Sequence, residues 1–304
     1  MMVGNMVGGE PNAELGATAE SAMTSSDKRA ICALCPHRCS LAEGQRGICQ
    51  ARIARDGVVV DENYGRITSL ALDPIEKKPL ARFMPGSSVL SIGSYGCNMH
   101  CGYCQNASIA QVGPAHVEWR RMEPADIAEM ASMFALQGNI GVAFTYNEPL
   151  VGFEFVHDCA QEVHQRGMKN VLVSNGQINP EPLAELLPLI DAANIDLKGF
   201  TPAIYRQLGG DLDTTLATIK AMANEPNLHL EVTTLVVPGL NDSPDQMAKE
   251  AAWIASLDPQ IPLHVTRFFP CYKMLQLEPT PLDTLHALAD VARESLDFVY
   301  LGNC

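Results

Sequence analysis

The stretch Val89-Leu-Ser-Ile-Gly93-Ser-Tyr-Gly-Cys97-Asn-Met-His-Cys101-Gly-Tyr-Cys104 joins a short strand-like run to three closely spaced cysteines. The run ends in turn residues, as a buried strand does. Three thiolates at spacings of three and two intervening residues can converge on one [4Fe–4S] cubane and leave its fourth iron without a protein ligand. A small molecule can chelate at such an open position. The stretch therefore predicts a metal centre on Cys97, Cys101 and Cys104.

Zinc is the alternative metal for this loop. A closed structural zinc site needs four ligands, and His100 could supply the fourth. Unrelated thiols that bind no metal are the remaining reading of the same residues.

From Val89 onward, short β-branched runs alternate with amphipathic segments of helical length, the pattern of repeated β–α units around a parallel sheet. Six such units are fewer than the eight of a closed barrel, so an α/β fold with a partial (β/α)6 barrel is expected over residues 89–304. The expected strands are 89–94, 140–145, 170–174, 193–197, 228–236, 262–267 and 297–301. The expected helices are 124–136, 150–166, 180–188, 211–224, 244–257 and 280–294.

The N-terminal part of the chain divides into two segments. Residues 1–28 are rich in small and polar residues without a sustained apolar period, which predicts a disordered leader. Residues 29–88 carry Cys32, Cys35, Cys39 and Cys49, a full set of four thiolate ligands for a small cap. Their spacing is neither that of a zinc ribbon nor that of a ferredoxin, so zinc and a second [4Fe–4S] cluster both remain open.

Composition narrows the function classes and the compartment. The formal net charge of −14 argues against nucleic-acid binding, which needs clustered Lys and Arg. Neither a membrane-spanning apolar run nor a signal peptide is evident in the sequence. Ten cysteines, seven of them in two groups, suit metal binding in a reducing compartment better than disulfides. A cytoplasmic protein without a membrane partner is therefore expected.

The cysteine loop, with the aromatic Tyr103 before its last cysteine, resembles the signature of the radical S-adenosylmethionine (SAM) superfamily. The likeness extends over roughly residues 89–301, and within the superfamily the chain is similar to activating enzymes of glycyl-radical enzymes, such as the pyruvate formate-lyase activating enzyme. Further motifs resemble the AmmeMemoRadiSam-system branch; they are Cys32-Ala-Leu-Cys35-Pro-His-Arg-Cys39, Gly47-Ile-Cys49, Asp73-Pro-Ile-Glu-Lys-Lys-Pro79 and Tyr146-Asn-Glu-Pro149. The resemblance implies a [4Fe–4S] cluster that cleaves SAM reductively to methionine and a 5′-deoxyadenosyl radical.

The resemblance also implies which residues bind SAM. Asn147 and Glu148 follow the second strand, where the superfamily often carries Gly-Gly-Glu to hold the methionine amino group, and a carboxylate suits an ammonium. Asn175, Asp196 and Lys198 follow the third and fourth strands and are assigned to the methionine carboxylate and the ribose. The alternatives are a solvated loop acid at Glu148 and a structural ion pair between Asp196 and Lys198. Tyr103 is placed in the cofactor site with them.

The chain departs from the activating enzymes at two positions. Val173 stands where those enzymes carry an acidic residue beside a cation site, and Tyr272 stands near their ribose-contacting His. His264 and Arg267 are an odd number of residues apart on one strand, so they point to opposite faces. We expect Arg267 to face the cofactor and His264 to be a buried core residue.

By this resemblance, the radical abstracts hydrogen from a glycine of a partner protein, and the reductant is a flavodoxin or ferredoxin. Hydrogen abstraction from a small metabolite is the alternative reaction. A metal-binding electron-transfer or scaffold protein without turnover is the alternative from another class.

Overall fold

The computed structural model describes residues 29–304, and the leader predicted for residues 1–28 lies outside them. Its centre is an eight-stranded sheet in the order β14-β13-β12-β11-β10-β9-β7-β6. All neighbouring pairs from β7 to β14 are parallel, and β6 pairs antiparallel with β7 at one edge. The strands are β6 (Ser69–Pro74), β7 (Ser88–Gly93), β9 (Asn139–Phe144), β10 (Lys169–Ser174), β11 (Ala192–Asp196), β12 (His229–Val236), β13 (Leu263–Arg267) and β14 (Val299–Gly302).

Helices connect successive parallel strands, and every helix predicted from the sequence is present with somewhat different ends. The predicted helices are α2 (Pro124–Met133), α3 (Phe153–Gln165), α4 (Pro180–Leu186), α6 (Leu212–Ala223), α7 (Pro244–Leu257) and α8 (Leu282–Arg293). Proline occupies the first turn of α2, α4 and α7, where its missing N–H is not needed. The sequence analysis missed two short helices, α1 (Ala107–Ala110) and α5 (Pro202–Gln207).

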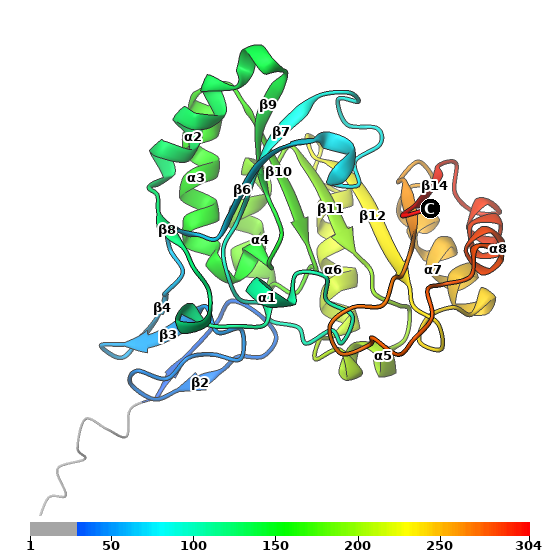
Figure 1. Cartoon of the computed structure of the whole chain (residues 1–304), viewed down its shortest axis with the longest axis horizontal. Helices are drawn as coiled ribbons and strands as arrows, with labels where there is room; N and C mark the ends of the chain where they lie inside the picture. The colour runs from blue at the N-terminus through cyan, green and yellow to red at the C-terminus, as the bar shows by residue number, and fades with distance from the viewer. Residues whose placement is uncertain (1–28) are drawn as a thin grey trace, which may run out of the picture.

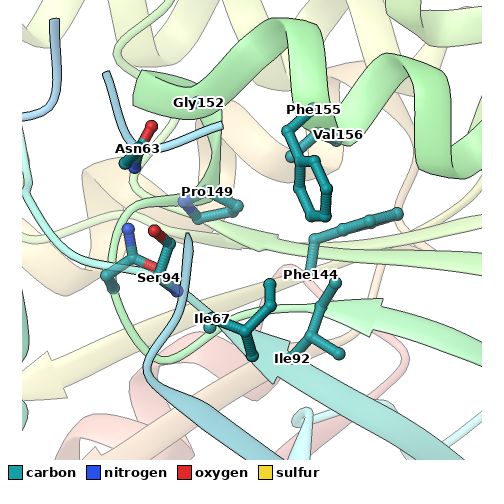
Figure 2. A pocket seen from close by; sticks show the side chains of 11 residues that line it. Asn63, Ile67, Ile92, Ser94, Phe144, Pro149, Gly152, Phe155 and Val156 are labelled. Atoms are coloured by element: carbon teal, nitrogen blue, oxygen red, sulfur yellow. The ribbon is translucent and has the colours of Figure 1, made fainter. Parts of the chain in front are cut away.

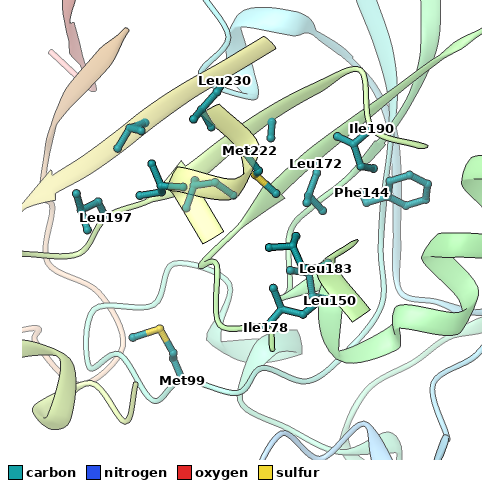
Figure 3. Close-up of a cluster of buried hydrophobic side chains, with 14 of the residues drawn as sticks. Met99, Phe144, Leu150, Leu172, Ile178, Leu183, Ile190, Leu197, Met222 and Leu230 are labelled. Carbon is teal, nitrogen blue, oxygen red and sulfur yellow. The ribbon is translucent and has the colours of Figure 1, made fainter. Parts of the chain in front are cut away.

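The larger hydrophobic core fills the space between the sheet and the helices. Figure 3 shows Phe144, Leu172 and Leu230 from the strands near Leu183 and Met222 from the helices. Because side chains alternate along a strand, the intervening residues point into the barrel interior. That interior is where polar residues gather toward the carboxyl ends of the strands.

The segment after β6 fills the amino-terminal end of the barrel interior, and we call residues 75–87 the plug. It begins with the short 3-10 helix η2 (Ile75–Lys77). Its fully buried apolar side chains pack against inward-facing residues of β7, β9, β10 and β11; the cluster comprises Ile75, Leu80, Val89, Ala143, Val171 and Ala192. In Figure 1 the plug, in cyan, lies at the end of the sheet opposite the blue cap. The sequence analysis assigned β6 and the plug to the cap, but they join the barrel.

A buried carboxylate fastens the plug to β12. Glu231 accepts hydrogen bonds from the backbone N–H groups of Ala81 (3.0 Å) and Arg82 (2.8 Å). The rings of His229 (2.8 Å) and His264 (2.5 Å) bond to the same carboxylate. Four partners on one buried carboxylate satisfy its acceptor capacity.

The remaining N-terminal residues form a small cap over the carboxyl ends of the strands (Figure 1). Its short antiparallel pairs are β1 (Ala30–Ile31) with β2 (Ser40–Leu41) and β3 (Arg52–Arg55) with β4 (Val58–Asp61). β5 (Arg66–Ile67) pairs with β8 (Arg120–Arg121). The cap is tied to the barrel by a two-pronged ion pair of Arg52 with Glu154 on α3, both contacts at 2.6 Å. Asn179, before α4, donates to the carbonyl oxygen of Ala33 at 2.6 Å.

Candidate functional site

A cavity of about 380 Å³ opens at the carboxyl ends of the parallel strands. Nine of the residues predicted for the metal centre and cofactor line this one cavity: Cys97, Cys101, Tyr103, Cys104, Asn147, Glu148, Asn175, Asp196 and Lys198. Asp196 is the last residue of β11, and the others lie in the loops after β7, β9, β10 and β11. Ligand sites of parallel α/β barrels form at this end of the strands, because the loops there converge.

The cysteine loop is held in a shape that permits no side chain at Gly96. Gly96 has φ +92°, and a Cβ there would come within 2.4 Å of the carbonyl oxygen of Cys49. The N–H of Cys97 donates to that same carbonyl at 3.2 Å. The cap and the cysteine loop are therefore in direct backbone contact.

The three thiols are poorly solvated. Burial raises the pKa of Cys97 well above its usual range, and the nearby carboxylate of Glu148 raises it further. Burial also raises the pKa of Cys101 and Cys104. A positively charged metal group compensates such a penalty, because metal binding releases the thiol proton and stabilises the thiolate. As the side chains of residues 29–304 stand, no three His, Cys, Asp or Glu groups converge on a single metal ion position.

Asn147 supports the cysteine loop. Its side-chain amide donates to the carbonyl oxygens of Tyr95 (3.2 Å) and Gly96 (3.1 Å), and its Oδ1 accepts from the N–H of Ser94 at 2.9 Å. These bonds use most of the capacity of the amide. Asn147 thus lines the cavity and also fixes the loop that carries the cysteines.

Glu148 braces two neighbouring loops, so it is not the solvated acid that was the alternative. Its carboxylate accepts from the N–H groups of Leu150 (3.0 Å) and Asn175 (2.8 Å) and from the hydroxyl of Ser174 (2.8 Å). Burial raises its pKa to about 7, against the effect of these donors. A carboxylate has about four acceptor positions, so one remains for a ligand.

Asn175 touches the cysteine loop directly. Its Nδ2 lies 3.6 Å from the sulfur of Cys97 and 2.9 Å from Oδ1 of Asn98. An N–H aimed at a ligand sulfur tunes the reduction potential of a cluster. The structure therefore places Asn175 beside the cysteine loop.

Asp196 and Lys198 form an ion pair of 3.0 Å on the cavity wall. Burial alone would lower the pKa of the ammonium, but Asp196 and Cys101 raise that of Lys198 well above its usual range. Lys198 is therefore charged at neutral pH, and beside the cysteine loop it would attract an anionic ligand group.

Arg267 is a correction to the sequence analysis. Its Nε donates to the carbonyl oxygen of Thr280 at 2.8 Å, and its guanidinium lies over the ring of Phe269. Thr266, one residue earlier, lines the cavity, so alternation along β13 turns His264 inward and Arg267 outward. The expected opposition of the two side chains is confirmed, but the choice of Arg267 for the interior was wrong.

The cavity also contains residues that the sequence analysis missed, chiefly Lys77, Lys78, Asn194, Thr233 and Thr266. Polar residues at alternate positions of an otherwise apolar strand are the signal that could have identified the last three. In residues 29–304, Oη of Tyr103, Oδ1 of Asn194 and Oγ1 of Thr233 are buried without a hydrogen-bond partner. Such atoms suit a polar ligand, since buried polar groups are normally paired.

The four cysteines of the cap are not part of the cavity lining, and short contacts link some of them to one another. A Cβ on Gly47 would lie 3.7 Å from the sulfurs of both Cys39 and Cys49. Cys32 donates its N–H to the carbonyl oxygen of Cys39 at 2.9 Å. Burial raises the pKa of Cys35 to about 12, and the neighbouring Cys32 and Cys49 contribute in the same direction.

A second, apolar cavity of about 20 Å³ lies between β7, β9 and α3 (Figure 2). Phe144, Phe155 and Val156 form much of its wall. Its volume is about that of one water molecule, so it is a packing gap in the core.

Comparisons with known proteins show the family of the chain. Residues 91–251 match the family model of the Radical SAM superfamily. The uncharacterised protein MJ0808 of Methanocaldococcus jannaschii is 39% identical over 279 residues, which are 91% of this chain and 82% of that protein. The 4-hydroxyphenylacetate decarboxylase activating enzyme of Clostridioides difficile is 28% identical over 114 residues, 37% of this chain and 36% of that enzyme.

Among solved structures, Streptococcus suis SuiB bound to the precursor peptide SuiA has a similar fold. The TM-score is 0.53 at 13% identity, over 71% of this chain and 48% of that one. Among residues 29–304, no helix has the length and apolar character needed to cross a membrane.

Proposed function

Because the chain belongs to the radical SAM superfamily, we propose that its cavity is the site where SAM is cleaved and a hydrogen atom is taken from a second substrate. The family match and the parallel sheet confirm the predicted fold class, a partial radical SAM barrel. The superfamily uses a [4Fe–4S] cluster and SAM, which when bound supply methionine and a 5′-deoxyadenosyl radical. The observation that carries the proposal is one cavity lined by three thiols and by polar residues on or just after five successive strands, β9 to β13.

Each group of lining residues has a distinct part in this proposal. Cys97, Cys101 and Cys104 would hold the cluster, with Asn147 fixing their loop. Lys198 attracts the methionine carboxylate, and the free acceptor position of Glu148 takes the amino group. Tyr103 adds a buried aromatic face to the same wall, and its hydroxyl has no hydrogen-bond partner among residues 29–304.

The proposal is tested by reducing the cluster-loaded protein with dithionite under anaerobic conditions in the presence of SAM. The release of 5′-deoxyadenosine is then measured. The wild type and a Cys304→Ala control, which changes an exposed thiol, should both release it. Cys101→Ala should release none. Release by Cys101→Ala, or no release by a fully loaded wild type, would contradict the assignment.

For the hydrogen donor we propose a small molecule held in the cavity. The plug closes the amino-terminal end of the barrel interior, so the cavity is a chamber of limited depth. The second candidate donor is a glycine of a partner protein, which the similarity to an activating enzyme favours. Transfer of deuterium from a labelled compound into 5′-deoxyadenosine would support the first, and a radical on a partner glycine would support the second. A flavodoxin or ferredoxin would supply the electron.

The four cap cysteines are proposed to hold a second metal, either zinc or an iron–sulfur cluster. Their number and spacing in the sequence, and the burial of Cys32, Cys35 and Cys49, support this role. Metal analysis of anaerobic Cys97→Ala/Cys101→Ala/Cys104→Ala protein should find the remaining metal, and Cys32→Ala added to that variant should remove it. A triple variant without bound metal would refute the second site.

A further inference from the structure

The motif from Asp73 to Pro79 forms part of the cavity wall. Asp73 lies near the end of β6, and Lys77, Lys78 and Pro79 of the plug line the cavity at its amino-terminal side. The sequence analysis used this motif only for its family resemblance. Its position gives the cavity a charged floor, built by a segment separate from the loops that carry the predicted SAM ligands.

Lys78 is the centre of this floor. Its side chain is only 4% exposed, and its Nζ lies 2.9 Å from Oδ2 of Asp73. The ammonium also stands over the ring of Tyr146, 4.7 Å from the ring centre. Tyr146 in turn donates its hydroxyl to Asp73 at 2.7 Å. The ammonium is thereby fixed in place before a ligand arrives.

The floor carries an excess of positive charge. Asp73 pairs with Lys78 and also with Lys77, whose Nζ lies 3.3 Å from Oδ1 of Asp73. Two cations therefore face one carboxylate. The hydrogen bonds of Tyr146 and Lys78 hold the pKa of Asp73 well below its usual range, against the effect of burial, so the carboxylate stays charged. An ammonium has three donors, and Asp73 takes one from Lys78.

The floor is a different place from the wall that holds Lys198. Lys198 is paired with Asp196 and is influenced by Cys101 and Tyr103, close to the metal centre. The charged groups that act on Lys78 are Asp73 and Lys77. Two cations at separate positions of one cavity suit two ligands, each with an anionic group.

Polar groups adjoin this floor. Asn194 donates to the carbonyl oxygen of Pro79 at 2.8 Å, which fixes the orientation of its amide and leaves Oδ1 unpaired within residues 29–304. The hydroxyl of Thr233, on the neighbouring strand, is also without a partner there. These atoms are complementary to hydroxyl or amino groups.

We propose that Lys78, held by Asp73 and Tyr146, binds the carboxylate or phosphate of the second substrate, a small anion that also carries a hydroxyl or amino group. This inference rests on the proposed function, because it gives the chemical class of the hydrogen donor. It makes the plug a substrate-binding element as well as a closure of the barrel.

Binding of two probes, malonate and inorganic phosphate, tests the proposal on cluster-loaded protein with SAM present. Isothermal titration calorimetry at constant ionic strength should give a Kd for one of them, and the stronger probe identifies carboxylate or phosphate as the preferred group. Lys78→Met should weaken that Kd about ten- to hundredfold, the usual effect of removing a charged hydrogen bond. Lys220→Met, on the exposed face of α6, is the matched control and should leave it unchanged.

Loss of Lys78 leaves Asp73 partly unpaired, so Asp73→Asn/Lys78→Met provides a variant without that charge. It should bind as weakly as the single variant. The inference would be overturned if wild type and both variants bound the probe equally, or if the wild type bound neither probe. It would also be overturned if the probe bound only when SAM was left out. Release of 5′-deoxyadenosine is measured in parallel: if the wild type releases it but binds neither probe, the inference fails and the proposed function stands. Lys78-dependent binding without any release would instead overturn the proposed function and with it the substrate role.

Discussion

Replacing Glu231 by Gln should loosen the plug. The hydrogen bonds from two histidine rings and two backbone N–H groups outweigh burial and lower the pKa of this carboxyl to about 2. That is roughly 2.5 pH units below its ordinary 4.5, and at about 1.4 kcal/mol per unit the charged form stabilises the fold by about 3 kcal/mol. In Glu231→Gln, an NH2 group replaces one carboxylate oxygen and cannot accept the hydrogen bonds that this oxygen accepted from N–H groups. Most of this stabilisation is therefore lost.

Two measurements check the prediction. The free energy of unfolding in urea at pH 7 should fall by about 3 kcal/mol, and the amides of Ala81 and Arg82 should exchange hydrogen on the order of a hundredfold faster. Since the folded-state pKa is lowered, the stabilisation is present above pH 4.5 and is lost as the pH falls from 4.5 toward 2. The difference between wild type and variant should therefore narrow over that range.

The control is Glu185→Gln, the same substitution on an exposed residue of α4. It should change the free energy of unfolding by less than about 0.5 kcal/mol. The reasoning is refuted if Glu231→Gln behaves like this control, or if the exchange of Ala81 and Arg82 is unaltered. Either result would mean that the plug is held by its apolar contacts alone.

Three further predictions concern the cap contact, a buried acid and the metal centre. Gly96→Ala should disrupt the loop at the carbonyl of Cys49 and reduce cluster content, measured as iron and sulfide per chain, whereas Gly57→Ala, with open space around it, should not. Burial raises the pKa of Glu250 to about 8, so the buried carboxyl opposes folding more and more as the pH rises from 4.5 to 8. Glu250→Gln should therefore have a higher free energy of unfolding in urea than the wild type, by up to about 5 kcal/mol at pH 8 and by little at pH 5. Asn175→Ala should shift the cluster's reduction potential in a redox titration monitored by electron paramagnetic resonance, and an unchanged potential would exclude a bond to the cysteine sulfur.

The sequence predicted the elements that follow from local patterns. The seven parallel strands and the cysteine loop after the first of them were predicted because buried strands and ligand spacings are properties of short segments. Glu148, Asp196 and Lys198 were assigned to the cofactor site by the family resemblance, and their position at the carboxyl ends of predicted parallel strands agreed with it, because those ends meet at one side of the sheet.

What the sequence did not predict depends on contacts between distant residues. β6 and the plug were assigned to the cap, because nothing in residues 69–87 indicates that Leu80 packs inside the barrel. Arg267 was preferred over His264 because alternation gives two opposite faces but not which face is inward. The partner of His264, Glu231, lies on another strand and is evident only in the folded chain.

The bonds between the plug and Glu231 join residues 150 and 149 positions apart in the chain. During synthesis on the ribosome, roughly half of the chain must therefore follow Ala81 and Arg82 before their amides can bond to the carboxylate of Glu231. Such high contact order makes folding slow, and the first strands stay open to wrong pairing in the meantime. Chaperones that shield the nascent N-terminal half should consequently raise the yield of folded protein.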